Sequence, residues 1–398
     1  MDIPLPPGGY DIAVVLNYYK PYVSGLTTTA EAIAESLAAR GHRVAVVAAR
    51  HERSLPAFER RNGVDVLRAP VLARVSRGPV SPGFPFTAAR VARRSRVVNL
   101  HVPMLEAGLV ARLLRGAAPL VTTYHADIPT DGGPVEALAA RAVASSARAA
   151  IRRSAGVVVN SEAAARQSRL RDAFRGSATT AIPAPCHDRS GGRPRYRRTR
   201  GLHVGYAGRI HAEKGIEYLI TAFRAIPDPE ARLLLAGDHL NVAGGSSIER
   251  VRRAAGEDPR IVFLGLLSGD ELKDFYASID VLSLPSVTES FGIVQVEGMM
   301  AGVPAVTTDS PGGRVPIAAT GFGTLVPPRD PEAIAAALTA LGALPPAERR
   351  AGAERARRRF GLGACIDAYE ELFARLGGGR AEVLGPEVWS GASATMEE

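Results

Sequence analysis

The fold depends on the stretch Leu202-His-Val-Gly-Tyr-Ala-Gly-Arg-Ile-His-Ala-Glu-Lys-Gly215. Its apolar start, over residues 202–207, predicts a buried strand, its glycines permit a tight turn, and a helical pattern follows over residues 215–225. A strand that passes through a short turn into a helix is the building unit of a parallel α/β sheet. The turn is therefore expected at the carboxyl end of a strand, where such sheets bind ligands.

The same alternation continues on both sides of this stretch. Continuous valine-rich runs, typical of parallel strands covered on both faces, alternate with longer helical patterns. We predict strands over residues 11–16, 43–48, 97–101, 120–124, 157–160, 232–236, 261–264, 281–284 and 305–308. We predict helices over residues 27–40, 105–115, 135–153, 247–255, 270–278, 291–301 and 331–341.

A polar, basic segment divides this alternation into two series. Residues 188–200 have no apolar period and are predicted to form a linker. Two strand–helix series predict an α/β protein with two doubly wound, Rossmann-like domains that face each other across a cleft, over residues 1–187 and 201–362. A helix over residues 363–376 is expected to pack back on the first domain. Residues 377–398 are glycine-rich, then polar and acidic, which predicts a disordered tail.

The composition is that of an ordinary globular protein with a basic excess. Of the 398 residues, 46% are hydrophobic and 22% charged, and the formal charge is +9. No apolar run reaches the roughly eighteen residues that span a bilayer, and the polar start lacks the profile of a signal peptide. Cys186 and Cys365 are far apart, which indicates a reduced, cytoplasmic setting. No nucleic acid partner is predicted, because no DNA- or RNA-binding motif accompanies the basic charge.

Nearly all of the cationic residues are arginines, which makes each lysine notable. Lys214 lies in the turn described above, together with Arg209, just before a predicted helix. Two cations near a helix N-terminus suit a diphosphate, through charge-assisted hydrogen bonds and the helix dipole. A turn with solvated charges is the alternative. The turn is neither a Walker loop nor a dinucleotide fingerprint, because the glycine spacing of both is absent.

A second motif reads Pro285-Ser-Val-Thr-Glu-Ser-Phe-Gly-Ile-Val-Gln-Val-Glu-Gly-Met-Met-Ala-Gly302. Glu289 follows a predicted strand, and Ser290 is placed to cap the next helix. The backbone amides of that helix's expected first turn belong to Phe291, Gly292 and Ile293. Glu297 comes slightly more than two helical turns after Glu289, so we expect both carboxylates to face the same side. The helix dipole alone explains an acidic residue at 289 but not one within the apolar stretch at 297.

Together these segments resemble the family-four retaining glycosyltransferases of the GT-B fold, the glycosyl transferases group 1. The resemblance rests on Gly-Arg-x-x-x-x-Lys-Gly at 208–215, Ala236-Gly-Asp238 and the pair Glu289 and Glu297. The segment Tyr19-Lys-Pro-Tyr-Val-Ser-Gly-Leu26 is similar to that family's opening loop. The resemblance covers about residues 10–376 and implies the GT-B fold.

The resemblance implies roles for residues of the second domain. Arg209 and Lys214 would hold the diphosphate of a nucleotide-sugar donor. Glu289 would lie against the transferred sugar, and Glu297 would bind the ribose hydroxyls. The amides at the start of the following helix would also face the donor.

Two residues of the first domain are implied as well. Gly25 would approach the donor phosphates, although Ser24 precedes it where many relatives have a second glycine. His125, in Thr122-Thr-Tyr-His-Ala-Asp127, would contact the donor sugar near the reacting centre. A purely structural histidine is the alternative. His101, at the end of the preceding predicted strand, is a further candidate in the same layer.

The implied activity is transfer of a hexosyl group from a UDP- or GDP-sugar with retention of the anomeric configuration, without a cofactor or metal. Asp238 and Asp309 are isolated, so no metal site is predicted. A glycan, a lipid-linked acceptor and a small alcohol all remain open as acceptors. Arginines beside apolar residues at 84–96 and 137–153 fit either peripheral contact with the inner face of an anionic membrane or solvated helices.

Other functions also fit parts of the pattern. A nucleotide-sugar epimerase or a phosphorylase would share the fold, and a non-catalytic partner would bind a donor without turnover. A retaining glycosidase needs two carboxyls about 5 Å apart. A glycosidase is disfavoured because the two glutamates are expected to lie two helical turns apart. A donor-binding titration beside a turnover assay separates these possibilities.

Overall fold

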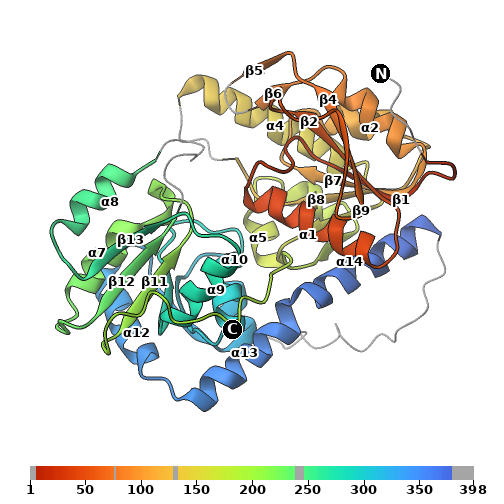
Figure 1. The fold of residues 1–398 in the computed structure, drawn as a ribbon. Helices are drawn as coiled ribbons and strands as arrows, with labels where there is room; N and C mark the ends of the chain where they lie inside the picture. Colours follow the sequence, from red (N-terminus) through yellow and green to blue (C-terminus); the bar gives the residue numbers. More distant parts are fainter. Residues whose placement is uncertain (1–5, 76–77, 129–132, 238–245, 379–398) are drawn as a thin grey trace.

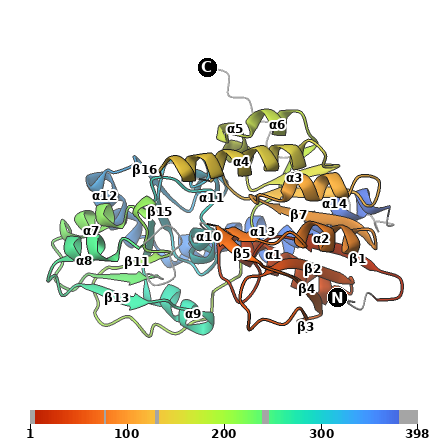
Figure 2. The same cartoon turned by 90° about the horizontal axis from the view of Figure 1, so that it is seen from above.

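The computed structural model of the protein describes residues 6–75, 78–128, 133–237 and 246–378. Figure 1 shows two α/β lobes side by side, each built around its own sheet, and Figure 2 shows the same two lobes from above. This arrangement confirms the predicted fold class of two Rossmann-like domains.

The first domain contains an eight-stranded sheet in the order β10-β9-β8-β7-β1-β2-β4-β3. All neighbouring strands are parallel except β3 and β4, which are antiparallel at one edge. The strands are β1 (Tyr10–Val15), β2 (Val44–Arg50), β3 (Phe58–Arg61), β4 (Val64–Pro70), β7 (Ser95–Val102), β8 (Leu120–Tyr124), β9 (Gly156–Val159) and β10 (Thr179–Ala181). A separate hairpin consists of β5 (Ala73–Val75) and β6 (Gly78–Val80).

Helices cover both faces of this sheet. One core joins the sheet to α2 (Phe84–Ala92), α3 (Ala107–Leu113), α4 (Pro134–Ile151), α5 (Glu162–Gln167) and α6 (Arg171–Arg175). The other core joins it to α1 (Gly25–Ala39) and to the C-terminal helix α14 (Leu362–Gly377). Because both faces are buried, the central strands are apolar on both sides, as their sequences predict.

The second domain contains a parallel six-stranded sheet in the order β13-β12-β11-β14-β15-β16. Its strands are β11 (His203–Ala207), β12 (Arg232–Ala236), β13 (Ile261–Gly265), β14 (Val281–Leu284), β15 (Ala305–Thr308) and β16 (Gly323–Val326). One face packs on α7 (Ile216–Arg224), α8 (Ile248–Ala255) and α12 (Pro331–Gly342). The other packs on α9 (Gly269–Ser278), α10 (Ile293–Met300), α11 (Arg314–Thr320) and α13 (Pro346–Phe360).

The C-terminal helices join the two domains. Phe360 at the end of α13 is buried in the core of the second domain, and α14 begins two residues later. On α14, Tyr369 and Phe373 are buried against the first sheet beside α1. Figure 1 shows these helices in blue, running from one lobe to the other. The chain therefore returns to the domain in which it started.

Each sheet has one topological switch point, where consecutive units leave in opposite directions. In the first sheet the chain moves from β1 to β2 on one side and later to β7 on the other. In the second sheet β12 lies on one side of β11 and β14 on the other. Ligands of open α/β sheets bind beyond the carboxyl ends of the strands at such points. A ligand is therefore expected at the loops after β1, β7, β11 and β14.

The structure confirms the predicted strands and helices to within a few residues at each end. It adds elements that were not predicted, among them the edge strands β3, β10 and β16 and the helix α13. The linker residues 188–200 contain neither helix nor strand. Cys186 and Cys365 are both buried free thiols. The tail expected to be disordered lies, from residue 379 onward, outside the described residues.

Among the helices that the structure describes, none combines the length and the apolar character that a membrane crossing requires.

Candidate active site

Two loops of the second domain meet at the switch point between β11 and β14. The backbone N–H of Val287 donates to the carbonyl of Glu213 at 2.8 Å. Gly215 has a φ of 60°, and a Cβ added there would lie 2.4 Å from the carbonyl oxygen of Pro285. Only glycine tolerates both that conformation and that proximity. The loop that carries Lys214 is thus held against the loop that carries Glu289.

Lys214 and Glu289 form an ion pair between these loops, with Lys214 Nζ 2.8 Å from Glu289 Oε2. The side chains are only 15% and 13% exposed. Glu289 also accepts hydrogen bonds from the Ser286 hydroxyl at 3.3 Å and from the Ser290 backbone N–H at 3.0 Å. Burial by itself would raise the pKa of Glu289, but the ammonium of Lys214 and these donors lower it below its usual value. Glu289 is therefore an ionised carboxylate.

The helix after Glu289 begins later than its sequence predicts. Gly292 is its N-cap, with a left-handed φ of 81°, and α10 runs from Ile293. Ser290 therefore does not cap the helix, and Phe291 lies before its first turn, which corrects both expectations. The reason is local, because the left-handed residue at 292 interrupts helical geometry. The first N–H groups of α10 have no acceptor within the helix, so they can bind an anion.

Glu297 lies on α10 but shares no partner with Glu289. Its Oε1 accepts from Arg189 Nε of the linker at 3.1 Å, and its Oε2 accepts from the Tyr276 hydroxyl of α9 at 3.3 Å. Burial raises the pKa of Glu297, and Arg189 opposes this effect. Helical periodicity does not relate the directions of the two carboxylates, because Glu289 lies four residues before the start of α10, so their alignment stays a prediction.

Arg209 lies in the same loop as Lys214 but is much more exposed. Its Nη2 is 2.9 Å from Glu213 Oε1, and its side chain is 49% exposed. The Tyr206 hydroxyl donates to the Arg209 carbonyl at 2.7 Å and so fixes the loop backbone. The guanidinium can therefore move to a ligand without breaking a buried contact.

The remaining acidic candidates form no metal cluster in the described part of the chain. Asp309 pairs with Arg314 at 2.8 Å. Asp238 lies outside the described residues. Nowhere in the described ranges do three or more histidine, cysteine, aspartate or glutamate side chains gather as metal ligands would.

In the first domain, Gly25 is the first residue of α1. A Cβ added to Gly25 would meet no atom within 4 Å, so the site is open there. Ser24 caps the helix: its hydroxyl accepts from Thr27 N–H at 3.2 Å, and its own N–H donates to Thr27 Oγ1 at 2.8 Å. This capping box explains why a serine is stable at that position.

His101, near the carboxyl end of β7, is in contact with His125, which directly follows β8. Nδ1 of His101 is 2.9 Å from Nε2 of His125, and Nε2 of His101 is 2.7 Å from Oδ1 of Asn99. Asn99 and His101 are almost completely buried, whereas His125 is partly exposed. Burial lowers the pKa of His125 to about 3 and that of His101 well below its usual value, so both rings are neutral at neutral pH.

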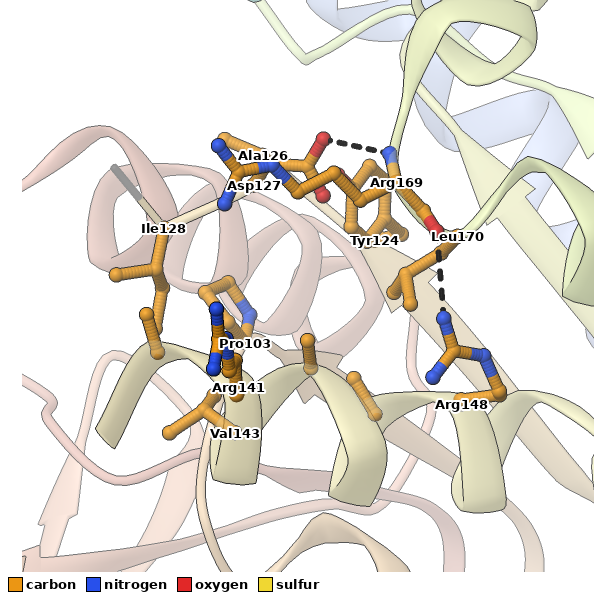
Figure 3. Close-up of a pocket in the computed structure, with 13 residues that line it drawn as sticks. Pro103, Tyr124, Ala126, Asp127, Ile128, Arg141, Val143, Arg148, Arg169 and Leu170 are labelled. Atoms are coloured by element: carbon orange, nitrogen blue, oxygen red, sulfur yellow. Dashed lines mark hydrogen bonds between the residues drawn. The ribbon is translucent and has the colours of Figure 1, made fainter. Parts of the chain in front are cut away.

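A pocket of about 240 Å³ lies in the first domain, shown in Figure 3, and its lining includes Tyr124 and Ala126, the sequence neighbours of His125. Apolar side chains of α4, together with Tyr124 and Leu170, form its walls. Arg141 and Arg148 also line it, and Arg148 donates to the carbonyl of Arg169 at 3.3 Å. The pocket thus combines apolar walls with the arginines Arg141, Arg148 and Arg169 and one carboxylate, that of Asp127.

Several residues of these sites were not predicted from the sequence. They are Asn99, Arg189, Tyr276 and Ser286. A signal existed for Asn99, because a polar residue within the apolar run of β7 needs a buried hydrogen-bond partner. Arg189 carried no such signal among the many arginines of the linker.

The Lys214–Glu289 pair predicts a measurable coupling. We expect Lys214→Met and Glu289→Gln to be coupled by about 1–3 kcal/mol in a double-mutant cycle of urea unfolding at pH 7. Because the folded pKa of Glu289 is depressed, this stabilisation is present above the ordinary glutamate pKa and is lost as the pH falls through the folded value. A coupling of zero at pH 7, or one that persists in acid, would contradict the assignment.

Comparison with known proteins identifies the architecture. The glycosyl transferases group 1 model matches residues 201–343, and the glycosyl transferase 4-like domain model matches residues 24–185. The chain is 33% identical over 194 residues to D-inositol 3-phosphate glycosyltransferase of Salinispora tropica. The aligned region covers 44% of this chain and 39% of that protein. The alignments with such curated relatives span only about two fifths of those proteins.

Solved structures match over nearly the whole chain. Sucrose-phosphate synthase from Thermosynechococcus elongatus superposes with a TM-score of 0.74 at 21% identity, covering 92% of this chain and 99% of the other. The Anabaena protein HepE in complex with UDP and glucose superposes with a TM-score of 0.70 at 19% identity, covering 92% and 100%. At these identities the likeness shows the GT-B fold. With a family model matched on each of its two domains, the chain belongs to the glycosyl transferases group 1 family.

Proposed function

We propose that the protein is a retaining glycosyltransferase that moves a hexosyl group from a UDP- or GDP-sugar to a hydroxyl acceptor. The observation that carries this proposal is the Lys214–Glu289 ion pair at the switch point of the second sheet, beside the N-terminus of α10. An ammonium, unpaired helix amides and a fixed carboxylate at one place suit an anionic diphosphate joined to a polyhydroxyl group.

In this proposal the donor lies across the loops after β11 and β14. Its diphosphate is held by Lys214, by Arg209 after the guanidinium leaves Glu213, and by the amides of Phe291, Gly292 and Ile293. Glu289 accepts hydrogen bonds from the hydroxyls of the transferred sugar. The first domain contributes Gly25 to the phosphates and His125 to the sugar.

The ribose hydroxyls are assigned to Glu297. Each carboxylate oxygen of Glu297 accepts one hydrogen bond, from Arg189 or from Tyr276, and an ionised carboxylate has further acceptor sites. Burial is the larger effect and raises the pKa of Glu297, while Arg189 and the Tyr276 hydroxyl favour the ionised form, which is the form that accepts from two hydroxyls.

The chemical step needs charge stabilisation more than a protein nucleophile. The bond between the anomeric carbon and the diphosphate oxygen breaks, the acceptor oxygen bonds to the same face, and the acceptor proton passes to a phosphate oxygen. Lys214, Arg209 and the α10 amides stabilise the negative charge that develops on the leaving diphosphate. Support for the class comes from the family and the fold, and from relatives such as HepE, whose structure holds UDP and glucose.

The acceptor is assigned to the pocket of Figure 3 in the first domain, which Tyr124 and Ala126 line on either side of His125 in the sequence. Its apolar walls and its arginines suit an acceptor with an apolar part and a negative charge, which includes lipid-linked phosphates. Peripheral contact with an anionic membrane, through the arginines and apolar residues at 84–96 and 137–153, is part of the same proposal.

The donor is identified by thermal shift. We expect one of UDP, GDP, UDP-glucose and GDP-mannose to raise the melting temperature, with a stabilisation of about 2.7 kcal/mol at 100 times Kd. Lys214→Ala should abolish the shift, whereas the control Lys273→Ala, which removes an exposed lysine paired with Asp270, should keep it. Glu289→Ala should lose turnover. An unchanged shift in Lys214→Ala would overturn the donor assignment.

Transfer is proposed to need no metal or other cofactor. We expect turnover in excess EDTA to match turnover with added Mg²⁺, because cationic side chains and helix amides neutralise the leaving diphosphate. Loss of activity in EDTA that Mg²⁺ restores would contradict this part of the proposal.

A further inference from the structure

A chain of buried polar groups runs along the first sheet and ends at His125. Asn99 and His101 belong to β7, Thr123 belongs to β8, and His125 follows β8 directly. Nδ2 of Asn99 is 2.8 Å from Thr123 Oγ1, Oδ1 of Asn99 is 2.7 Å from His101 Nε2, and His101 Nδ1 is 2.9 Å from His125 Nε2. Within this chain, the Asn99 amide restricts where His101 carries its proton, and His101 restricts where His125 carries its proton.

The orientation of the Asn99 amide is fixed by the backbone. Its Nδ2 lies 3.3 Å from the carbonyl oxygen of Val121, which can only accept a hydrogen bond. If the amide were turned over, two oxygens would face each other in a buried site, which is unfavourable. Oδ1 of Asn99 therefore faces His101.

The amide then determines the tautomers of both histidines. Oδ1 of Asn99 only accepts, so Nε2 of His101 carries a proton. A neutral imidazole has a single N–H, so Nδ1 of His101 is unprotonated and accepts from Nε2–H of His125. Burial lowers the pKa of both rings, which keeps them neutral. Nδ1 of His125 is left without a proton.

We propose that Asn99 and His101 are positioning residues that hold His125 as its Nε2–H tautomer, so that Nδ1 accepts a hydrogen bond from a hydroxyl of the transferred sugar. This inference rests on the proposed function, because it assigns His125 to the sugar of the donor. It adds a specificity rule: the sugar must present a hydrogen-bond donor to His125, and a deoxy analogue at that position binds less well.

The tautomer can be measured without any substrate. In the full chain labelled with ¹⁵N-histidine, nitrogen chemical shifts and two-bond couplings to the ring protons distinguish the two tautomers, and His125→Gln assigns the signals of His125. We expect wild-type His125 to be the Nε2–H tautomer at pH 7. Finding the Nδ1–H tautomer in the wild type would overturn the inference, and this measurement needs no variant to fold beyond the one used for assignment.

Two variants separate positioning from a purely structural role. Asn99→Leu removes the acceptor of His101, so His101 can carry its proton on Nδ1 and donate to His125, which then becomes Nδ1–H. The matched control, Thr123→Val, removes a hydrogen bond from the same network but leaves the contact between Asn99 and His101, so the tautomer should be unchanged. If Asn99→Leu does not fold, His101→Phe serves instead, because it removes the acceptor for His125 Nε2–H.

We expect Asn99→Leu to lower kcat with the donor identified by thermal shift about tenfold, the equivalent of one hydrogen bond, while Thr123→Val stays near the wild type. An Asn99→Leu spectrum that still shows Nε2–H, or equal losses of kcat in both variants, would overturn the inference. The protein could instead show the expected tautomer but neither bind nor turn over any nucleotide sugar. That result would contradict the proposed function.

Discussion

A carboxylate that is shielded from water needs a nearby cation to stay ionised. The loops of the second domain supply one to Glu289. Glu289 is ionised because Lys214 lies 2.8 Å away, and Lys214 can reach it only because the loops after β11 and β14 are in backbone contact. That contact needs glycine at 215, since a side chain there would collide with the Pro285 carbonyl. The strand order supplies the rest, because β11 and β14 are neighbours that lead to helices on opposite faces.

The switch point of the first domain carries neutral hydrogen-bonded groups. The polar groups at the carboxyl ends of β7 and β8 are neutral, and Asn99, His101 and His125 are hydrogen-bonded to one another. Burial stabilises the neutral form of each imidazole, as it would destabilise a charge. One domain thus presents an ion pair at its switch point, and the other presents neutral hydrogen-bonding groups of fixed direction. The C-terminal helices connect the two domains, because α13 packs on the second sheet and α14, which follows it directly, packs on the first.

Much of the fold was predictable, because parallel strands that are buried on both faces are continuous apolar runs. The strands β8, β12, β14 and β15 match the predicted residues 120–124, 232–236, 281–284 and 305–308. The edge strand β3 was missed because half-exposed edges carry polar residues, as in its sequence Phe-Glu-Arg-Arg. The helix α13 was missed because its arginine-rich sequence shows little apolar period.

Within the site, residue types were more predictable than contacts. Lys214 and Glu289 were both singled out, but their direct pairing depends on how two loops far apart in sequence pack together. The start of α10 was misplaced because a left-handed residue at Gly292 has no unambiguous sequence signal next to a plausible serine cap. The role of Arg189 at Glu297 depends on the path of the linker, which side-chain chemistry alone does not specify.

Central to the proposed function is the binding of a nucleoside diphosphate where the loops after β11 and β14 meet. Hydrogen–deuterium exchange of the full chain, with and without saturating UDP or GDP, tests this binding most directly. We predict slower exchange at residues 208–216 and 286–297 with the nucleotide that binds. Saturated binding that protects only other segments, such as the pocket beside α4, would contradict it.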